Sequence, residues 1–192
     1  MGGIGAEGFV VLPGPFGADL ADAIAAARAA IADAQPGDVR EGSTTLRVNG
    51  MIERAPSLRA LLDYPPLREA ARTVCGQGFR PSSFHARGVG PGAAPQKLHQ
   101  DVRNGAEGWP LTGFIWMIDA FTTANGATRF VPGSASLESL PNSQLIHHPG
   151  EVQACGAAGS LIVYNGSVWH GHGRNGTTEW RWSVQGAFVP AE

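Results

Sequence analysis

Short β-prone runs separated by tight-turn sequences make up the second half of the chain, and this texture limits the fold more than any other feature. Four Asn-Gly pairs lie in this region, beginning at residues 104, 125, 165 and 175. Both residue types tolerate the positive φ that two-residue hairpin turns require. The pattern predicts strands over residues 82–89, 97–103, 112–119, 127–131, 160–164 and 181–189. Many short strands with turns between them indicate a closed or sandwiched β architecture.

The first 78 residues have a different pattern, which predicts mainly helices. A short β-type run at 8–12 precedes a helix over 19–34, and a second helical region over 57–75 is interrupted by Pro65-Pro66. The polar segment 35–56 is expected to be irregular. A chain of 192 residues is long enough for one domain with a substantial core. We therefore expect a single domain, in which residues 1–78 supply a strand and helices that pack outside a β core formed by residues 79–192.

A histidine and an aspartate, His99 and Asp101, stand two residues apart within the predicted strand 97–103. Residues i and i+2 of a strand point to the same face, so both side chains can address one metal ion. A second histidine, His170, lies far downstream. Two histidines and one carboxylate form the facial triad that binds iron(II) and leaves coordination positions open. These three residues therefore predict a metal centre at which distant parts of the chain converge.

Two alternatives stay open for this trio. His172 lies on the same alternation face as His170 and could replace it as the third ligand. The three residues could also form a hydrogen-bond network in the core without a metal. His85 has no carboxylate partner at a useful spacing, and a position in the wall of a pocket is its candidate role.

Arg181 lies eleven residues beyond His170, in the sequence Trp180-Arg181-Trp182-Ser183-Val184, which reads as a strand with two polar side chains on one face. The planar guanidinium of arginine suits bidentate capture of a carboxylate. Arg181 is therefore a candidate for binding an acidic ligand beside the predicted metal.

These motifs together resemble the phytanoyl-CoA dioxygenase (PhyH-like) family over most of the chain. The segments that carry the resemblance are residues 8–12, 99–101, 114–119, 125–134, 169–170 and 181–183. The resemblance implies a mainly β fold, the double-stranded β-helix or cupin-like jelly roll, and an enzyme that uses iron(II), 2-oxoglutarate and dioxygen. It also implies that His99, Asp101 and His170 bind iron, while Arg181 binds the distal carboxylate of 2-oxoglutarate.

The same resemblance implies that Ser183 and Trp116 line the 2-oxoglutarate pocket. Two departures from the family pattern are visible. Ala135 stands where many relatives carry a histidine after the Pro-Gly-Ser turn, which concerns the local loop and not the iron ligands. The chain is also shorter than many relatives, which argues against a CoA thioester as the substrate.

Four basic side chains are candidates for binding the substrate. By alternation, Lys97 and Arg103 share the inward face with the two ligands on strand 97–103, while Arg87 and Arg129 lie on neighbouring predicted strands. They predict a positive pocket for a small polar or acidic metabolite. The alternative for each is a solvated charge at the end of a strand.

Composition narrows the classes of partner. Fourteen basic and sixteen acidic side chains give a formal net charge of −2 without a basic block, which disfavours nucleic acid as a partner. No run approaches the roughly 20 apolar residues that span a bilayer, and the N-terminus lacks the pattern of a signal peptide. The two cysteines, Cys75 and Cys155, have no metal or redox spacing. We expect a cytoplasmic protein that acts on a small molecule; the oligomeric state is left open.

Asp101 bears on the type of reaction. Halogenases on the scaffold that this chain resembles replace the carboxylate ligand with a small residue, so the aspartate favours hydroxylation. Desaturation, epimerisation and ring closure share the same oxidant and stay open. Two other classes also stay open, namely a cupin-like metalloenzyme that uses zinc or manganese without oxygenase activity, and an inactive binding protein on the same scaffold.

Overall fold

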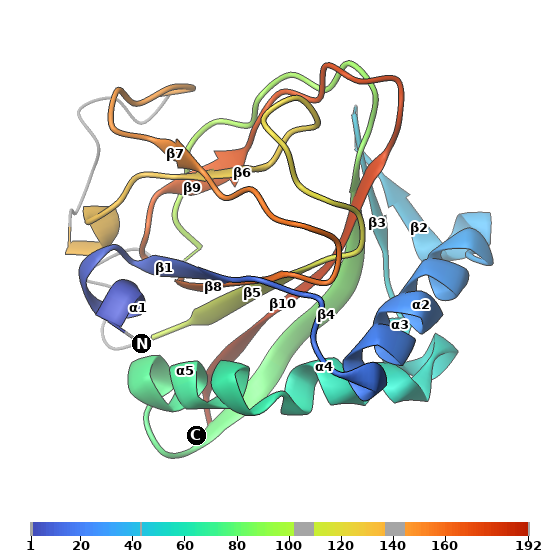
Figure 1. Cartoon of the computed structure of the whole chain (residues 1–192), viewed down its shortest axis with the longest axis horizontal. Helices are drawn as coiled ribbons and strands as arrows, with labels where there is room; N and C mark the ends of the chain where they lie inside the picture. The colour runs from blue at the N-terminus through green and yellow to red at the C-terminus, as the bar shows by residue number, and fades with distance from the viewer. Residues whose placement is uncertain (1, 43, 102–109, 137–144, 192) are drawn as a thin grey trace.

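Two antiparallel β-sheets form the centre of the computed structural model (Figure 1), which describes residues 2–42, 44–101, 110–136 and 145–191. The larger sheet has seven strands in the order β1-β8-β5-β10-β4-β3-β2, and the smaller has three in the order β7-β6-β9. The larger sheet consists of β1 Phe9–Leu12, β8 Leu161–Asn165, β5 Thr112–Met117, β10 Arg181–Pro190, β4 Phe79–Val89, β3 Thr45–Val48 and β2 Val39–Glu41. The smaller sheet consists of β7 Val152–Gln153, β6 Thr128–Phe130 and β9 His170–His172.

Side chains alternate between two apolar layers along the central strand β5. Phe114 and Trp116 belong to a core cluster shared with the helices, whereas Ile115 and Met117 belong to a second cluster that includes Phe130 of the smaller sheet. The two sheets therefore face each other across the second cluster. This arrangement confirms the predicted mainly β fold, a jelly roll with helices outside it.

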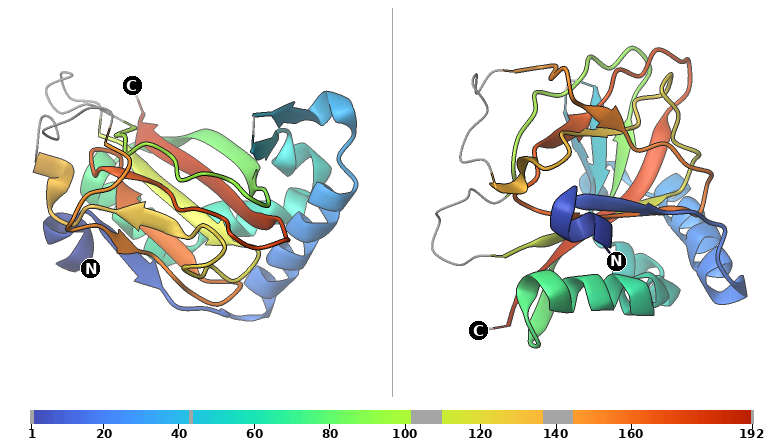
Figure 2. Two further views of the ribbon diagram at one scale, coloured as in Figure 1. Left: turned by 90° about the horizontal axis from the view of Figure 1, so that it is seen from above. Right: turned by 60° about the vertical axis from the view of Figure 1, so that its left-hand side comes forward.

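The helices cover the outer face of the larger sheet (Figure 2). Their buried residues come mainly from α2 and α5 and pack against the cluster that contains Phe114 and Trp116. The helices are α1 Gly2–Ala6, α2 Ala18–Ala32, α3 Met51–Arg54, α4 Arg59–Asp63 and α5 Pro65–Cys75, with 3-10 turns at Pro36–Asp38, Pro56–Leu58 and Ser134–Ser136. Among the described residues, none of the helices combines the length and apolarity that crossing a bilayer requires.

Two expectations about secondary structure are wrong. Segment 35–56 is not irregular, because it contains β2, β3 and α3, and β3 pairs with β4 in the larger sheet. The expected strand 97–103 is reduced, in its described part, to a single bridge between His99 and His170. Residues 102–109 lie outside the described part of the chain.

Pro65 and Pro66 begin α5 because proline suits the first turn of a helix, where its missing N–H has no partner to lose.

The backbone of Gly113 in the larger sheet packs closely against the ring of Tyr164, which lies between the sheets. Gly113 on β5 lies opposite Tyr164 on β8, and a Cβ atom at this position would overlap the Tyr164 ring. We expect Gly113→Ala to lower the free energy of unfolding by about 1–3 kcal/mol, because overpacking forces a displacement of the ring. Urea unfolding measures this change. The control is Gly37→Ala, where nothing lies within 4 Å of the added atom; equal midpoints for the two variants would contradict the packing described.

Candidate metal centre

Three potential metal ligands from distant parts of the chain meet at one end of the space between the sheets. The ligand atoms of His99, Asp101 and His170 lie within 4.8 Å of one another, and this is the group of metal-ligand type found among the described residues. His99 Nε2 is 3.8 Å from Asp101 Oδ1, and His170 Nε2 is 3.7 Å from Asp101 Oδ2. Two imidazoles and a carboxylate around one point match the donor set of a facial triad.

Backbone hydrogen bonds bring these residues together. The amide of His99 donates to the carbonyl of His170 at 2.9 Å, and the amide of His170 donates to the carbonyl of His99 at 2.9 Å. Two residues further on, the amide of Asp101 donates to the carbonyl of Gly166 at 2.8 Å. The ligand segment is therefore fastened at both of its ligand residues to the region around β9.

Hydrogen bonds also orient the two imidazoles. His99 Nδ1 lies 3.2 Å from the carbonyl oxygen of Lys97, and His170 Nδ1 lies 3.0 Å from that of Val168. A carbonyl oxygen only accepts, so each Nδ1 carries the proton and each Nε2 keeps its lone pair for a metal. Burial lowers the pKa of His170 to about 4, against the opposing effect of Asp101, so the ring is neutral at pH 7.

Tyr164 holds the carboxylate ligand in place. Its hydroxyl donates to Asp101 Oδ2 at 2.8 Å, while Asp101 Oδ1 faces His99. Burial, together with the adjacent Asp101 carboxylate, raises the pKa of Tyr164 well above its usual value, so the phenol stays protonated and remains a donor. Such partners of the ligands fix their orientation and tune their affinity for a metal.

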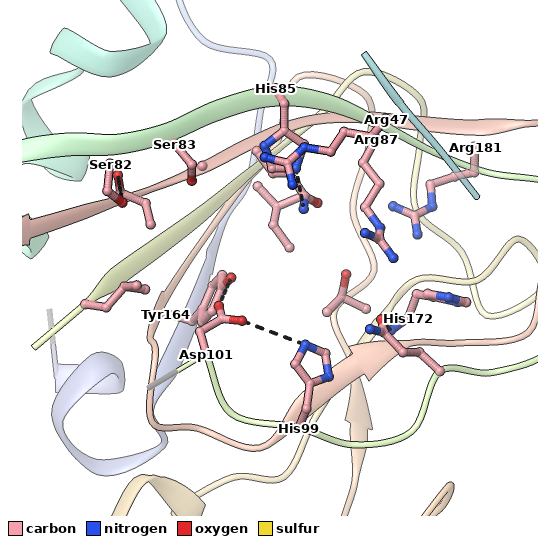
Figure 3. Close-up of a pocket in the computed structure, with 17 residues that line it drawn as sticks. Arg47, Ser82, Ser83, His85, Arg87, His99, Asp101, Tyr164, His172 and Arg181 are labelled. Atoms are coloured by element: carbon pink, nitrogen blue, oxygen red, sulfur yellow. Dashed lines mark hydrogen bonds and ion pairs between the residues drawn. The ribbon is translucent and has the colours of Figure 1, made fainter. Parts of the chain in front are cut away.

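Two of the three ligands, His99 and Asp101, line a polar cavity of about 380 Å³ between the sheets (Figure 3), and His170 lies behind them beside Asp101. His99 and Asp101 lie at one end of this cavity, and Arg181 reaches it from β10. The other polar residues in its wall are Arg47, Ser82, Ser83, His85, Arg87, Gln96, Thr128, Tyr164, His172 and Gln185.

Arg181 is a buried cation with unused hydrogen-bonding capacity. Its side chain lies over the ring of Phe121 at 3.9 Å, and Nη2 donates to the carbonyl of Gly126 at 2.8 Å. Its Nε is buried and has no hydrogen-bond partner, and no ion pair between described residues includes this guanidinium. Burial, and secondarily Arg87, lowers the pKa of Arg181 to about 9. A buried charge without a counter-ion is costly, so this arrangement fits a bound carboxylate.

The two other residues expected around the co-substrate are placed differently. Trp116 points to the opposite face of the larger sheet, where it packs against Phe16 and Tyr64. Its expected place in the pocket is therefore wrong, and Ile115 lines the cavity from this strand instead. Ser183 is fully buried on the cavity side of β10, and its hydroxyl donates to the carbonyl of Arg87 at 3.3 Å without lining the cavity.

Of the four basic side chains expected to bind a substrate, Arg87 lines the cavity. Lys97 is exposed and outside the cavity wall, because the chain before His99 is not a regular strand and Gln96 takes the inward place. Arg129 is buried and bound to Glu151 at 2.8 Å and to the carbonyl of Gln96 at 2.6 Å, so it ties loops together outside the cavity. Arg103 lies outside the described residues.

His172 and His85 both line the cavity without joining the ligand group. His172 Nδ1 faces the carbonyl of Gly173 at 2.9 Å, and burial lowers the pKa of this imidazole to about 4. Of the two candidates for the third ligand, the structure places His170 beside Asp101.

Several cavity residues were missed from the sequence. Alternation with Ile162 would have placed Tyr164 between the sheets, since both belong to the same core cluster. Arg47 was missed because its strand, β3, is four residues long and lies in a polar segment. Gln185 follows Arg181 and Ser183 by the same alternation and could have been found in this way.

Comparison with known proteins identifies the family of this chain. Residues 5–183 match the family profile of phytanoyl-CoA dioxygenase (PhyH). Dioxygenase ALT11 of Alternaria alternata is 33% identical over 178 residues, which cover 84% of this chain and 58% of that protein. Dioxygenase aneA of Aspergillus aculeatus is 28% identical over 148 residues, which cover 70% of this chain and 49% of that protein. The chain thus spans about half the length of these curated relatives.

Solved structures share the fold. HygX from Streptomyces hygroscopicus, crystallised with nickel and 2-oxoglutarate, superposes with a TM-score of 0.80 at 16% identity, covering 98% of this chain and 85% of that one. The non-heme alpha ketoglutarate dependent epimerase SnoN from nogalamycin biosynthesis gives a TM-score of 0.78 at 22% identity, covering 99% of this chain and 81% of that one.

The fold and the group of potential ligands define a jelly-roll protein with a candidate metal centre of facial-triad composition. Since the family profile matches nearly the whole chain, the protein belongs to the phytanoyl-CoA dioxygenase (PhyH) family. The resemblance inferred from the sequence motifs is therefore confirmed.

The contact between Tyr164 and Asp101 generates a prediction about metal affinity. We expect Tyr164→Phe to weaken binding of Mn(II) by about 10–100-fold, because the carboxylate ligand loses the partner that orients it. Calorimetric titration of Mn(II) into the metal-free protein measures the change. Tyr64→Phe, on the helix side of the larger sheet, is the matched control; equal affinity in the two variants would contradict the role given to the Tyr164 hydroxyl.

Proposed function

We propose that this protein is an iron(II)- and 2-oxoglutarate-dependent dioxygenase that hydroxylates a small polar or acidic metabolite. The observation that carries the proposal is the cavity that His99 and Asp101, grouped with His170, share with the buried Arg181. A zinc or manganese enzyme without a keto-acid co-substrate would have no use for the buried guanidinium at this place. Relatives that are named dioxygenases support the same reading.

Different residues of the chain would bind the metal and the co-substrate. His99, Asp101 and His170 would hold iron(II) through two Nε2 atoms and a carboxylate, which leaves the side toward the cavity open. Arg181 would pair with the distal carboxylate of 2-oxoglutarate and so aim the keto acid at the metal. When bound, iron and 2-oxoglutarate supply the oxidising chemistry, with release of succinate and carbon dioxide.

The surrounding residues orient the ligands and exclude water from part of the site. Tyr164 fixes the carboxylate ligand, and the carbonyls of Lys97 and Val168 fix the imidazoles. The apolar layer between the sheets, which includes Phe130, excludes water from one side of the site. Such positioning confines the reaction to the part of the substrate that reaches the open side of the metal.

Anaerobic spectroscopy and a succinate assay test this function together. The wild-type protein with iron(II) and 2-oxoglutarate should show a weak visible metal-to-ligand charge-transfer band, and it should form succinate in air. Asp101→Ala and His170→Ala should lose both, because each removes a ligand. Arg181→Met should raise the KM for 2-oxoglutarate at least tenfold, since it removes the charge that pairs with the distal carboxylate.

The control is Arg68→Gln, which removes an arginine that pairs with Asp63 on the helix side of the molecule. This variant should keep the KM for 2-oxoglutarate. Undiminished succinate formation in the Asp101 or His170 variants would refute the assignment of the ligands. A product with one added oxygen atom would support hydroxylation, whereas an isomerised, cyclised or desaturated product would contradict it and leave the oxygenase class intact.

A further inference from the structure

Two arginines stand directly opposite each other on neighbouring strands at the cavity wall. Arg47 on β3 and Arg87 on β4 are register partners, which places their Cβ atoms about 4.5–5.5 Å apart. Both line the cavity, and Figure 3 shows the two guanidinium groups directed into it. Like charges in this relation destabilise a sheet unless an anion lies between them or beside them.

No ion pair among the described residues includes Arg47 or Arg87, although the Asp101 carboxylate in the same cavity acts on Arg87 at longer range. Arg47 Nε donates to the side-chain oxygen of Asn49 at 3.2 Å, a neutral partner that leaves the positive charge unbalanced. Both side chains are only partly exposed, so water does not screen their charges completely.

The polar groups at the Arg47 end of this pair are neutral. Burial, followed by Arg47 and Arg87, lowers the pKa of His85 to about 3, so that its imidazole carries no charge at pH 7. His85 Nε2 lies 3.2 Å from the side-chain nitrogen of Gln185. The hydroxyl-bearing Ser82 and Ser83 lie on the same side of the cavity. Neutral polar groups around two cations make a wall suited to an anionic group.

Arg181 forms a separate position in the same cavity. It extends from β10 and is fastened to Gly126 and Phe121, whereas Arg47 lies two strands away, beyond β4. Figure 3 shows Arg47 next to His85, with Arg87 between this region and Arg181. 2-Oxoglutarate has one carboxylate for Arg181 and places its other end at the metal, so the keto acid leaves the Arg47 charge unmatched.

We propose that Arg47 and Arg87 bind an anionic group, a carboxylate or a phosphate, of the prime substrate. This inference rests on the proposed function, in which Arg181 serves 2-oxoglutarate. The two arginines narrow the substrate class to acids. The substrate is also small, because the cavity of about 380 Å³ must hold both the keto acid and the substrate. The anion at the β3 side would anchor the substrate and leave its carbon skeleton to extend toward His99 and Asp101.

Titration with simple anions tests the proposed site. The full chain, loaded with Mn(II) and saturating 2-oxoglutarate, is titrated calorimetrically with sodium acetate and with sodium methylphosphonate against sodium chloride at equal ionic strength. We expect one saturable site per chain for at least one probe, and the probe that binds more tightly identifies the group. Arg47→Gln and Arg87→Gln should each weaken this binding at least tenfold, because each removes half of the cationic pair.

Arg80→Gln is the matched control, since Arg80 is an exposed arginine on the same strand as Arg87. It should change the affinity less than twofold. No saturable binding of either probe, or equal binding by the wild-type protein and the Arg47 variant, would overturn the proposal.

A second arm separates this site from the proposed function. Arg181→Gln without metal or 2-oxoglutarate should still bind the preferred probe, and adding Arg47→Gln to that variant should abolish the binding. This result would support the anion site even if the protein formed no succinate. Loss of probe binding on Arg181→Gln alone, in a variant with an unchanged thermal unfolding midpoint, would overturn the inference, because the anion would then belong to the co-substrate position.

Discussion

Reciprocal backbone hydrogen bonding between His99 and His170 is the contact on which the candidate site depends. It joins a loop to a strand of the smaller sheet, more than seventy positions apart in the printed sequence, at the two residues whose imidazoles face Asp101. The smaller sheet is held in turn by the layer in which Phe130 packs against Ile115 and Tyr164. The site is therefore a product of tertiary packing: the side chains that would bind a metal converge only once both sheets face each other.

The charge distribution of the cavity favours anionic ligands. Arg181, Arg87 and Arg47 enter the cavity from three different strands, while Asp101 is the carboxylate in its described wall. Because a metal dication would add further positive charge, the cavity matches ligands that bring negative charge with them. A keto acid with two carboxylates and an acidic substrate fit this balance, whereas a neutral lipid would leave the buried Arg181 and the partly buried Arg47 and Arg87 without an anionic partner.

Tight-turn pairs and strand alternation predicted a closed or sandwiched β architecture, and the family resemblance narrowed it to a jelly roll. Strand alternation placed His99 and Asp101 on one face, and the resemblance singled out His170 as their partner. The resemblance misplaced Trp116. Alternation could not correct it, because all six residues of β5 are buried and neither face is marked by polarity. Lys97 was misplaced because alternation was extended into a segment that is not a regular strand. Arg47 escaped notice because β3 is short, and only its pairing with β4 carries it to the cavity.

Anomalous diffraction from crystals grown with Mn(II) and 2-oxoglutarate tests the central claim most directly. The account predicts one manganese peak within bonding distance of Nε2 of His99, Nε2 of His170 and a carboxylate oxygen of Asp101. It also predicts that the keto acid chelates this ion and places its distal carboxylate on Arg181. A manganese ion bound elsewhere, or a keto acid whose distal carboxylate lies away from Arg181, would contradict the account.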